Sequence, residues 1–332
     1  MRHRPRRRAR VRFAAISMRP RRRWRRFAVQ YGAVLVSALF CAHALLTVTA
    51  ALEQLHGPAE CGVPVFSAAE AGQYERWSGV AAAADLPWSA APPPALTALW
   101  DRLGSARLVT AFRITLPNPL WNEADNVALA ASLLAGTFIA PGETVSVIGL
   151  IGPLTKERGY GDGPGYADGR LVPVQAGGVC KIGTAVYNVA VYGGLTVLER
   201  HPHSMIVPYV HPGRDAAIAT GHKDVRVRND YGRPVGLWAA FADNTLFVAL
   251  YGDVDAPSVR WQHEELARVP APRERRPNPG LPAGAEQLVF AGYDGVTVRT
   301  SIIVQRPGRP PEAKLLSVDT YRPLPGVVEY GP

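Results

Sequence analysis

Charged residues are scarce in this sequence of 332 residues. They make up 19% of the chain, whereas hydrophobic residues make up 47%. This balance excludes an intrinsically disordered chain and indicates a globular protein. At about 100–200 residues per domain, the length allows two domains, or one domain with appendages.

Acidic residues are missing from the first 26 positions, which hold 13 arginines. The rest of the chain carries 24 basic residues (37 less 13) against 27 acidic ones, so its charges nearly cancel. A nucleic-acid-binding module carries its positive charge on the folded domain. The formal net charge of +10 therefore belongs to an arginine-rich tail, residues 1–26, and we expect no nucleic-acid partner.

Charge of either sign is absent from residues 27–52, FAVQYGAVLVSALFCAHALLTVTAAL. About 20 apolar residues are enough for a helix to cross the bilayer core, and arginines ahead of them hold that end in the cytoplasm. We therefore expect a transmembrane or signal-anchor segment, a single pass through the cytoplasmic membrane, and an extracytoplasmic C-terminal part. A cleaved signal remains open, and a core helix behind a basic arm is the alternative.

Cysteine is rare: the chain has three, and Cys41 falls in the apolar segment. Cys61 and Cys180 remain, so these two allow at most one disulfide. Pairing would suit an oxidising compartment. The alternative is one incidental thiol and one functional thiol, and the count leaves both open.

Composition divides the remainder of the chain into four regions. Residues 53–105 are rich in Ala, Pro and Trp, which we interpret as a juxtamembrane stalk. Residues 106–253 carry the predicted strands and helices of the main domain. Residues 254–284 are polar and proline-rich, as in a linker, and residues 285–332 alternate apolar and polar residues, as in a small β module.

Two principal helices are predicted in the main domain, which makes its fold class α+β with a small mixed sheet. The first covers 122–139, with Asn122 as its cap and leucine and alanine at helical spacing. The second covers 179–192 and ends at Gly193–Gly194. Between them, the glycine-rich stretch 152–178 is expected to form a long ordered loop that lines or closes over a cleft, with RLVPVQ (170–175) as a short strand. Strands are expected at 107–116, 195–200, 201–218 (broken by prolines), 223–230 and in a hairpin around Asp243–Asn244.

The stretch QAGGVCKIGTAVYNVA, residues 175–190, places Cys180 in the first turn of the second helix. Unpaired N–H groups and the helix dipole favour an anion there, which lowers the pKa of a thiol and makes it nucleophilic. A nucleophile also needs a base, and His201 and His203 follow some twenty residues later. Asp215 completes the order Cys, His, Asp, which transglutaminase-like and papain-like sites share. The thiolate would attack an amide while His203, or His201 in its place, moves the proton.

The same residues also have structural interpretations. A cysteine flanked by aliphatic residues is typical of a small core side chain, and an aspartate after a glycine suits a turn. Zinc bound by Cys180, His201, His203 and His211 is a third alternative, but a His-x-His pair with a distant cysteine is not a usual ligand spacing. We expect neither a metal nor a cofactor.

Several stretches together resemble the VanW-like family, which takes its name from an accessory protein of vancomycin-resistance clusters. The matching stretches are NVALAASLLAGTFIAPGETVSV, GLIGPLTKERGYGDGPGY, GRLVPVQAGGVCKIGTAVYNVAVYGGLTVLERHPHS, VPYVHPGRDAAI and KDVRVRND, from about 126 to 230. The family signature differs here at seven positions: Ala176 stands for a glycine, Val179 for an isoleucine, Lys181 for a glutamine, Gly183 for a hydroxyl residue, Val145 and Val147 for phenylalanines and Ile148 for an asparagine.

The resemblance implies an exported or membrane-anchored bacterial protein of the cell envelope, with peptidoglycan or its precursors as the partner. It implies no established reaction. A non-catalytic accessory or binding protein in peptidoglycan or glycopeptide-response biology is the favoured hypothesis. The alternative is an amidase or acyl transferase that acts on peptidoglycan peptide stems through Cys180, His203 and Asp215. The candidate ligand-binding residues are Thr184, Tyr187, Asn188 and Arg214.

Overall fold

The computed structural model describes residues 74–167 and 170–332. The arginine-rich tail, the expected membrane segment 27–52 and Cys61 lie outside the described residues. Within the described part of the chain, none of the helices combines the length and the apolar character needed to cross a bilayer.

A five-stranded antiparallel sheet forms the centre of the main domain, in the order β1-β2-β10-β9-β3. The predicted first strand is β2 (Leu108–Thr115), which pairs with β10 (Thr245–Tyr251). The expected hairpin joins β9 (Val235–Ala242) to β10. Asp243 and Asn244 turn it with positive φ angles of 49° and 55°, as a two-residue hairpin requires.

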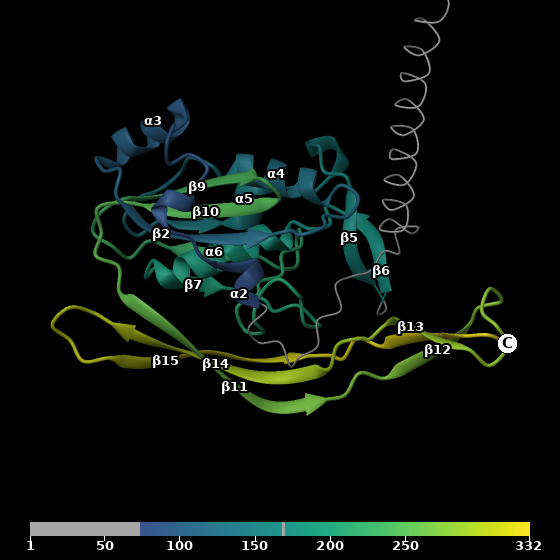
Figure 1. Cartoon of the computed structure of the whole chain (residues 1–332). Helices are drawn as coiled ribbons and strands as arrows, with labels where there is room; N and C mark the ends of the chain where they lie inside the picture. Colours follow the sequence, from purple (N-terminus) through teal and green to yellow (C-terminus); the bar gives the residue numbers. More distant parts are fainter. Residues whose placement is uncertain (1–73, 168–169) are drawn as a thin grey trace, which may run out of the picture. The chain divides into compact units, whose positions relative to one another are not determined.

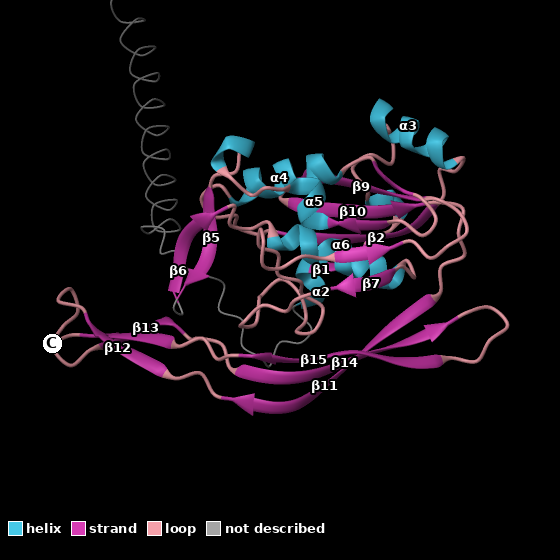
Figure 2. Ribbon diagram, turned by 180° about the vertical axis from the view of Figure 1, so that it is seen from behind, coloured by secondary structure: helices cyan, strands magenta, loops and turns pink. Residues whose placement is uncertain are grey.

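Helices cover both faces of this sheet because alternate side chains of a strand point to opposite faces. Phe112 and Ile114 of β2 pack with α4 (Glu123–Leu134) and α6 (Cys180–Tyr192). Ala111 packs instead with α3 (Pro94–Leu103). Figures 1 and 2 both show α3 and α6 on opposite sides of β9, β10 and β2. The fold is thus α+β, and α4 and α6 are the two principal helices of the domain.

The first predicted helix is shorter than expected. It ends at Leu134, and residues 137–139 form the edge strand β3 instead. Gly136, with a φ of 85°, makes the reversal that lets β3 pair with β9. Smaller elements surround the two helices: β4 (Thr144–Ser146), α5 (Val147–Ile151), η2 (Lys156–Arg158), β5 (Asp162–Ala167), β6 (Arg170–Gln175), β7 (Thr196–Glu199) and β8 (Arg226–Arg228).

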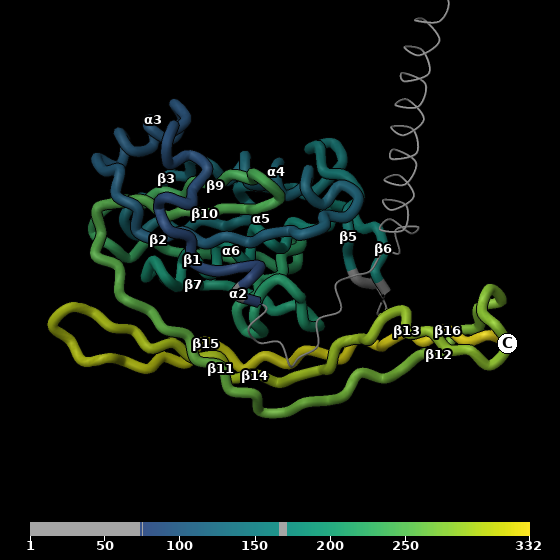
Figure 3. The backbone as a smooth tube through the Cα atoms, in the orientation of Figure 1, coloured from purple at the N-terminus to yellow at the C-terminus, as the bar shows by residue number. Residues whose placement is uncertain are grey.

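Residues 74–105 belong to the main domain, although composition suggests a stalk that extends over them. The short strand β1 (Ser78–Val80) pairs with β2 at the sheet edge, as Figure 3 shows. It follows the helical turn α2 (Tyr74–Trp77), and η1 (Ala83–Asp85) leads on towards α3. Leu96 and Leu99 of α3 are buried against the sheet. This alanine-rich segment therefore forms part of a hydrophobic core.

Two segments differ from their predicted structure. Residues 201–218 contain no regular strand, because Pro202, Pro208 and Pro212 lack the N–H groups that a ladder needs. The presumed linker 254–284 contains the twelve-residue strand β11 (Ser258–Val269) and the shorter β12 (Arg273–Pro277). Its prolines lie outside β11, which is free to pair along its whole length with β14 (Gly295–Gln305).

The C-terminal part is an all-β module of two three-stranded sheets. One sheet has the order β11-β14-β15, with β15 at Glu312–Tyr321. The other has the order β12-β16-β13, with β13 at Glu286–Phe290 and β16 at Gly326–Tyr330 (Figure 3). Ile302 and the half-buried Trp261 join the core of the main domain, so this module packs against it.

Candidate functional site

The turn before α6 brings Cys180 to the surface of a cavity. Gly177 lies so close to the backbone of Gly163 in β5 that a Cβ atom would approach its carbonyl carbon within 2.2 Å. Gly178 has a φ of 99°, and a Cβ there would meet Glu123 at 2.8 Å. Only glycine fits both positions. The two glycines therefore explain how the hairpin, the start of α4 and the start of α6 meet around the thiol.

One face of α6 holds the segment that follows the histidines. Cys180 Sγ lies 3.5 Å from the backbone nitrogen of Ile218, and Thr184 Oγ1 accepts the N–H of Ala216 at 3.0 Å. One turn further on, Asn188 Nδ2 donates to the carbonyl of Arg214 at 2.8 Å. Four helical residues rise about 6 Å, close to the rise of two extended residues. Residues four positions apart on α6 therefore lie opposite residues two positions apart in segment 214–218.

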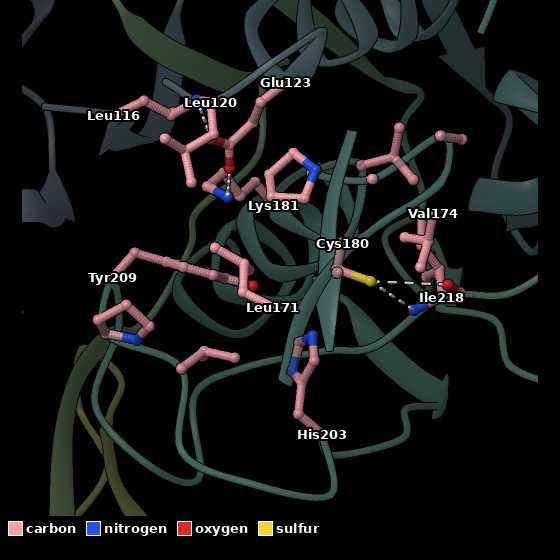
Figure 4. A pocket seen from close by; sticks show the side chains of 18 of the residues that line it. Leu116, Leu120, Glu123, Leu171, Val174, Cys180, Lys181, His203, Tyr209 and Ile218 are labelled. Atoms are coloured by element: carbon pink, nitrogen blue, oxygen red, sulfur yellow. Dashed lines mark hydrogen bonds and ion pairs between the residues drawn. The ribbon is translucent and has the colours of Figure 1, made fainter. Parts of the chain in front are cut away.

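This match aims Asp215 away from α6 and towards His203. His203 Nδ1 lies 2.6 Å from Asp215 Oδ2, and the backbone N–H of His203 donates to the same oxygen at 2.7 Å. Asp215 is fully buried, and 18% of the His203 side chain is exposed. With Nδ1 bound to the carboxylate, the other side of the imidazole faces Cys180 (Figure 4). The structure therefore brings together the three predicted residues in their predicted order.

The pKa values of the three groups move in the directions that an ion pair requires. Burial raises the pKa of Cys180, but the hydrogen bond and positive charge of His203 outweigh it and lower that pKa overall. Burial lowers the pKa of His203, but Asp215 and Cys180 raise it to about 9. Burial also opposes the charge of Asp215, whose partners nevertheless lower its pKa to about 2. These directions favour a thiolate on Cys180 beside an imidazolium on His203.

Asp215 is held from behind by residues outside the predicted triad. Arg200 Nη2 donates to Asp215 Oδ1 at 2.9 Å, and the hydroxyl of Tyr321 donates to the same oxygen at 2.5 Å. Each carboxylate oxygen thus has two donors, so the charge is fully compensated within the interior.

Cys180 and His203 line a cavity of about 520 Å³. Aliphatic side chains from the loop before α4, from β6 and from segment 214–220 form most of its walls, as Figure 4 shows: Leu116, Leu120, Leu171, Val174 and Ile218. The glycine-rich stretch is the β5–β6 hairpin, and Pro164 and Gly165 line the same space. The expectation that this stretch lines a cleft is confirmed.

One ion pair interrupts the apolar wall. Lys181 Nζ lies 2.5 Å from Glu123 Oε1, and their side chains are only 12% and 10% exposed. The ammonium also lies 4.6 Å from the centre of the Tyr209 ring, a cation–π distance. A charged pair beside the thiol gives this apolar cavity a polar point that can orient a ligand.

The domain that carries this site matches a known protein family. Residues 122–251 match the model of the family described as VanW like protein. These residues form a VanW-like domain. The match spans both principal helices, both hairpins and all three triad residues, and it confirms the resemblance drawn from the sequence.

Two curated relatives align with about this much of the chain. The uncharacterized protein YoaR of Bacillus subtilis (strain 168) is 31% identical over 146 residues, 44% of this chain and 48% of its own. The vancomycin B-type resistance protein VanW of Enterococcus faecalis (strain ATCC 700802 / V583) is 31% identical over 138 residues, 40% of this chain and 50% of its own. The chain thus spans about half the length of these relatives.

Two solved G5 domains are also similar to part of the chain. The G5 domain of IgA1 protease is 23% identical, with 24% of this chain and 98% of that one covered and a TM-score of 0.16. The HP0197-G5 crystal structure is 22% identical, with 23% and 100% covered and a TM-score of 0.14.

The other predicted site residues lie behind the cavity, outside its lining. Thr184 and Asn188 hold the backbone beside Asp215, and Arg214 donates to Asn188 Oδ1 at 3.0 Å. Tyr187 is buried against Trp261 of the C-terminal module. His201 pairs with Glu199 at 3.0 Å. The VanW-like domain thus uses these residues to build the frame of the site, and His203 alone of the two histidines faces the thiol.

Three groups at the site were not predicted from the sequence. Arg200 directly precedes the two candidate histidines, and this adjacency was the signal available. Glu123 lies in the first turn of α4, where an acidic residue is favourable in any helix and does not by itself indicate a site. Tyr321 follows Asp215 by 106 positions, and no local pattern marks it. Among the described residues, no cluster of three or more His, Cys, Asp or Glu side chains is arranged to hold a metal ion.

Proposed function

We propose that this chain is a cysteine acyl transferase or amidase that acts on peptide stems of peptidoglycan. The observation that carries the proposal is the chain of contacts from Cys180 through His203 to the buried carboxylate of Asp215. A purely structural cysteine needs no such partner. Burying an aspartate and a histidine is costly, and a pair of oppositely shifted pKa values is a mark of functional sites.

The reaction divides into two steps. The thiolate of Cys180 attacks a peptide carbonyl carbon, and the C–N bond breaks as the protonated His203 gives its proton to the leaving amine. A thioester on Cys180 remains, and His203 is then neutral. An incoming amine, or water, attacks the thioester and transfers its proton to His203, and the acyl product leaves the thiolate. An amine gives transpeptidation, whereas water gives hydrolysis.

Asp215 holds the imidazole in the orientation that both steps need. Its bond to Nδ1 fixes that nitrogen as the protonated one and leaves the other nitrogen to serve Cys180. The negative charge also stabilises the imidazolium, as the raised His203 pKa of about 9 indicates. This division of roles is the general logic of a nucleophile, a base and an orienting acid.

The cavity supports a peptide as the substrate. It has aliphatic walls for side chains, and the Lys181–Glu123 pair offers both charges to the carboxylate and amine groups of a peptide stem. One relative is named vancomycin B-type resistance protein VanW, and this name supports a role in glycopeptide resistance. Peptidoglycan stems are therefore the substrate class that we choose, and an extracytoplasmic location behind the 27–52 segment remains part of the proposal.

The non-catalytic accessory role that the sequence favoured stays a prediction. It would leave the lowered pKa of Cys180 and the raised pKa of His203 without a use. The catalytic alternative uses both. For this reason we place it first.

Alkylation of Cys180 tests the proposal. The full chain in detergent, with Cys41→Ser and Cys61→Ser, is treated with iodoacetamide across a range of pH. We expect the rate to titrate below the ordinary thiol pKa of about 8.5, and to return towards it in His203→Gln. The same protein is then incubated with purified muropeptides, and intact mass is measured. A thioester adduct that is absent from Cys180→Ser supports the proposal, whereas an ordinary titration and no adduct would reject it.

A further inference from the structure

Two residues of the C-terminal module, Asp319 and Tyr321, contribute to the hydrogen bonds that hold Asp215. The family match ends at residue 251, whereas Tyr321 and Asp319 lie in β15, the last strand of the sheet β11-β14-β15. Both side chains point inward, with 2% and 6% exposed. Thr320, between them, points outward and is exposed, as the alternation of a strand requires.

Tyr321 acts through a single hydroxyl group. That oxygen accepts the backbone N–H of Gly213 at 2.7 Å and donates to Asp215 Oδ1 at 2.5 Å. Burial and the neighbouring charge of Asp215 raise the pKa of Tyr321 well above its ordinary value, so the hydroxyl keeps its proton and remains a donor. It therefore fixes both the carboxylate and the turn that carries it.

Asp319 acts through an arginine. Arg200 Nη1 donates to Asp319 Oδ2 at 2.6 Å, while Nη2 donates to Asp215 Oδ1 at 2.9 Å. Arg200 Nε also donates to the backbone carbonyl of Asp215 at 2.7 Å. A planar guanidinium with three fixed acceptors has little freedom to turn, so Asp319 sets the direction from which Arg200 meets the catalytic acid.

The backbone of the module is fastened at the same place. The N–H of Arg322 donates to the carbonyl of Ser204, next to His203, at 2.7 Å. Gly213 packs so closely on Thr300 of β14 that a Cβ atom would lie 1.9 Å from its hydroxyl oxygen. The end of β15 thus contacts the histidine loop directly, and the middle of β14 contacts the aspartate turn.

We infer that the C-terminal module is part of the catalytic unit, with Tyr321 and Asp319 as positioning residues for Asp215. The inference rests on the proposed function, since it concerns the same Cys180, His203 and Asp215. It adds that the VanW-like domain without β15 has a misaligned acid. Without the Tyr321 hydroxyl, Asp215 Oδ1 keeps only Arg200, and the carboxylate can rotate away from His203.

The test compares Tyr321→Phe with Thr320→Val in the full chain. Tyr321→Phe removes one buried oxygen, whereas Thr320→Val removes an exposed hydroxyl that contacts Thr297 at 3.1 Å on the other side of the strand. Three quantities are measured: the His203 titration by NMR of labelled histidine, the pH dependence of Cys180 alkylation, and kcat and KM for muropeptides. Asp319→Asn is the second variant, in case Tyr321→Phe does not fold.

We expect Tyr321→Phe to move the His203 midpoint below about 9 and the Cys180 midpoint upward, because the bond between Asp215 and His203 loosens. A small misplacement of a catalytic group is costly, so kcat falls roughly tenfold while KM changes little. Asp319→Asn should change the His203 midpoint, the Cys180 midpoint and kcat in the same directions as Tyr321→Phe does. Thr320→Val should leave all three at their wild-type values. Unchanged titrations and kcat in folded Tyr321→Phe or Asp319→Asn would overturn the inference.

The readouts separate the two proposals. Wild-type protein that transfers no acyl group rejects the proposed function, yet the His203 titration still reports whether β15 positions Asp215. Transfer that is indifferent to Tyr321→Phe rejects the positioning role and leaves the proposed function intact.

Discussion

Two nearly buried carboxylates flank Cys180, and they are held in different ways. Asp215, behind the thiol, receives two donors on each oxygen and lies outside the cavity. Glu123, on the cavity side, receives Lys181 on one oxygen and the N–H of Leu120 on the other, at 3.1 Å. Lys181 and Glu123 both line the cavity.

This difference indicates that Asp215 belongs to the rigid frame of the site, whereas Glu123 and Lys181 belong to the surface that a ligand contacts. The four donor contacts on Asp215 come from three residues, Arg200, His203 and Tyr321. Its position is therefore over-determined, and it can orient His203 without moving. The pair of Glu123 and Lys181 has one ionic contact, and a ligand with its own charges can exchange partners with it. Substitutions on the two sides should therefore affect different quantities.

The largest effect is expected from Asp215→Asn. The amide has nearly the shape of the carboxylate, but it removes the charge that stabilises the protonated His203. We expect kcat for acyl transfer to fall by about 10³-fold and the His203 midpoint to fall from about 9 towards 6.5. Muropeptide kinetics and histidine NMR measure both. A kcat within threefold of wild type would mean that Asp215 is only structural.

The pH dependence of acyl transfer should follow the titrations of Cys180 and His203. The acidic limb reports loss of the Cys180 thiolate, and lies below the ordinary thiol value because that pKa is lowered. The alkaline limb reports loss of the His203 proton, with a midpoint of about 9. Above it, kcat should fall about tenfold per pH unit, because the leaving amine has no proton donor. Alkylation of Cys180 needs only the thiolate and should not show this alkaline loss.

The stability of the folded chain should depend on the same carboxylate at acidic pH. The pKa of Asp215 is lowered from 3.8 to about 2, so its contribution is present above pH 4 and is lost as the pH falls towards 2. The shift corresponds to about 2 kcal/mol. Urea unfolding should show the stability difference between wild type and Asp215→Asn shrinking by that amount between pH 4 and pH 2. A difference that stays constant over this window would contradict the lowered pKa.

The sequence predicted the three residues that meet beside the cavity better than it predicted the residues that hold them. Cys180, His203 and Asp215 were found because they follow one another in a known order and because a glycine pair marks the start of α6. Thr184 and Asn188 were also selected, but as ligand-binding residues. Their four-residue spacing on α6 contacts the backbone beside Asp215, and that role depends on a partner segment whose path no periodicity reveals.

The supports from the module could not be predicted for a physical reason. Tyr321 alternates correctly in a predicted strand, but alternation does not say which surface the strand covers. The stretch 258–269 was interpreted as part of a linker because residues 254–284 are polar and proline-rich. It has one strand partner, β14, and most of its residues are solvent-exposed. A strand of this kind has little need of apolar residues, so composition hides it.

The smallest effect is expected on the cavity side, from Lys181→Gln, which restores the glutamine of the family signature. Glu123 then keeps its charge with one fewer partner, which costs roughly 1–2 kcal/mol of unfolding free energy for a pair that is about one-tenth exposed. Cys180 also loses a positive neighbour that lowers its pKa, so alkylation at pH 7 slows. Urea unfolding and iodoacetamide kinetics measure the two effects.

The double variant Lys181→Gln, Glu123→Gln sharpens the comparison with Asp215. Two amides hydrogen-bond each other without a buried charge, so most of the lost stability should return. The slower alkylation should not return, because the ammonium is still absent. If KM for muropeptides rises in both variants while kcat changes little, the pair contacts substrate. A loss of kcat without any change in KM would instead mean that Lys181 positions the reacting groups and does not contact substrate.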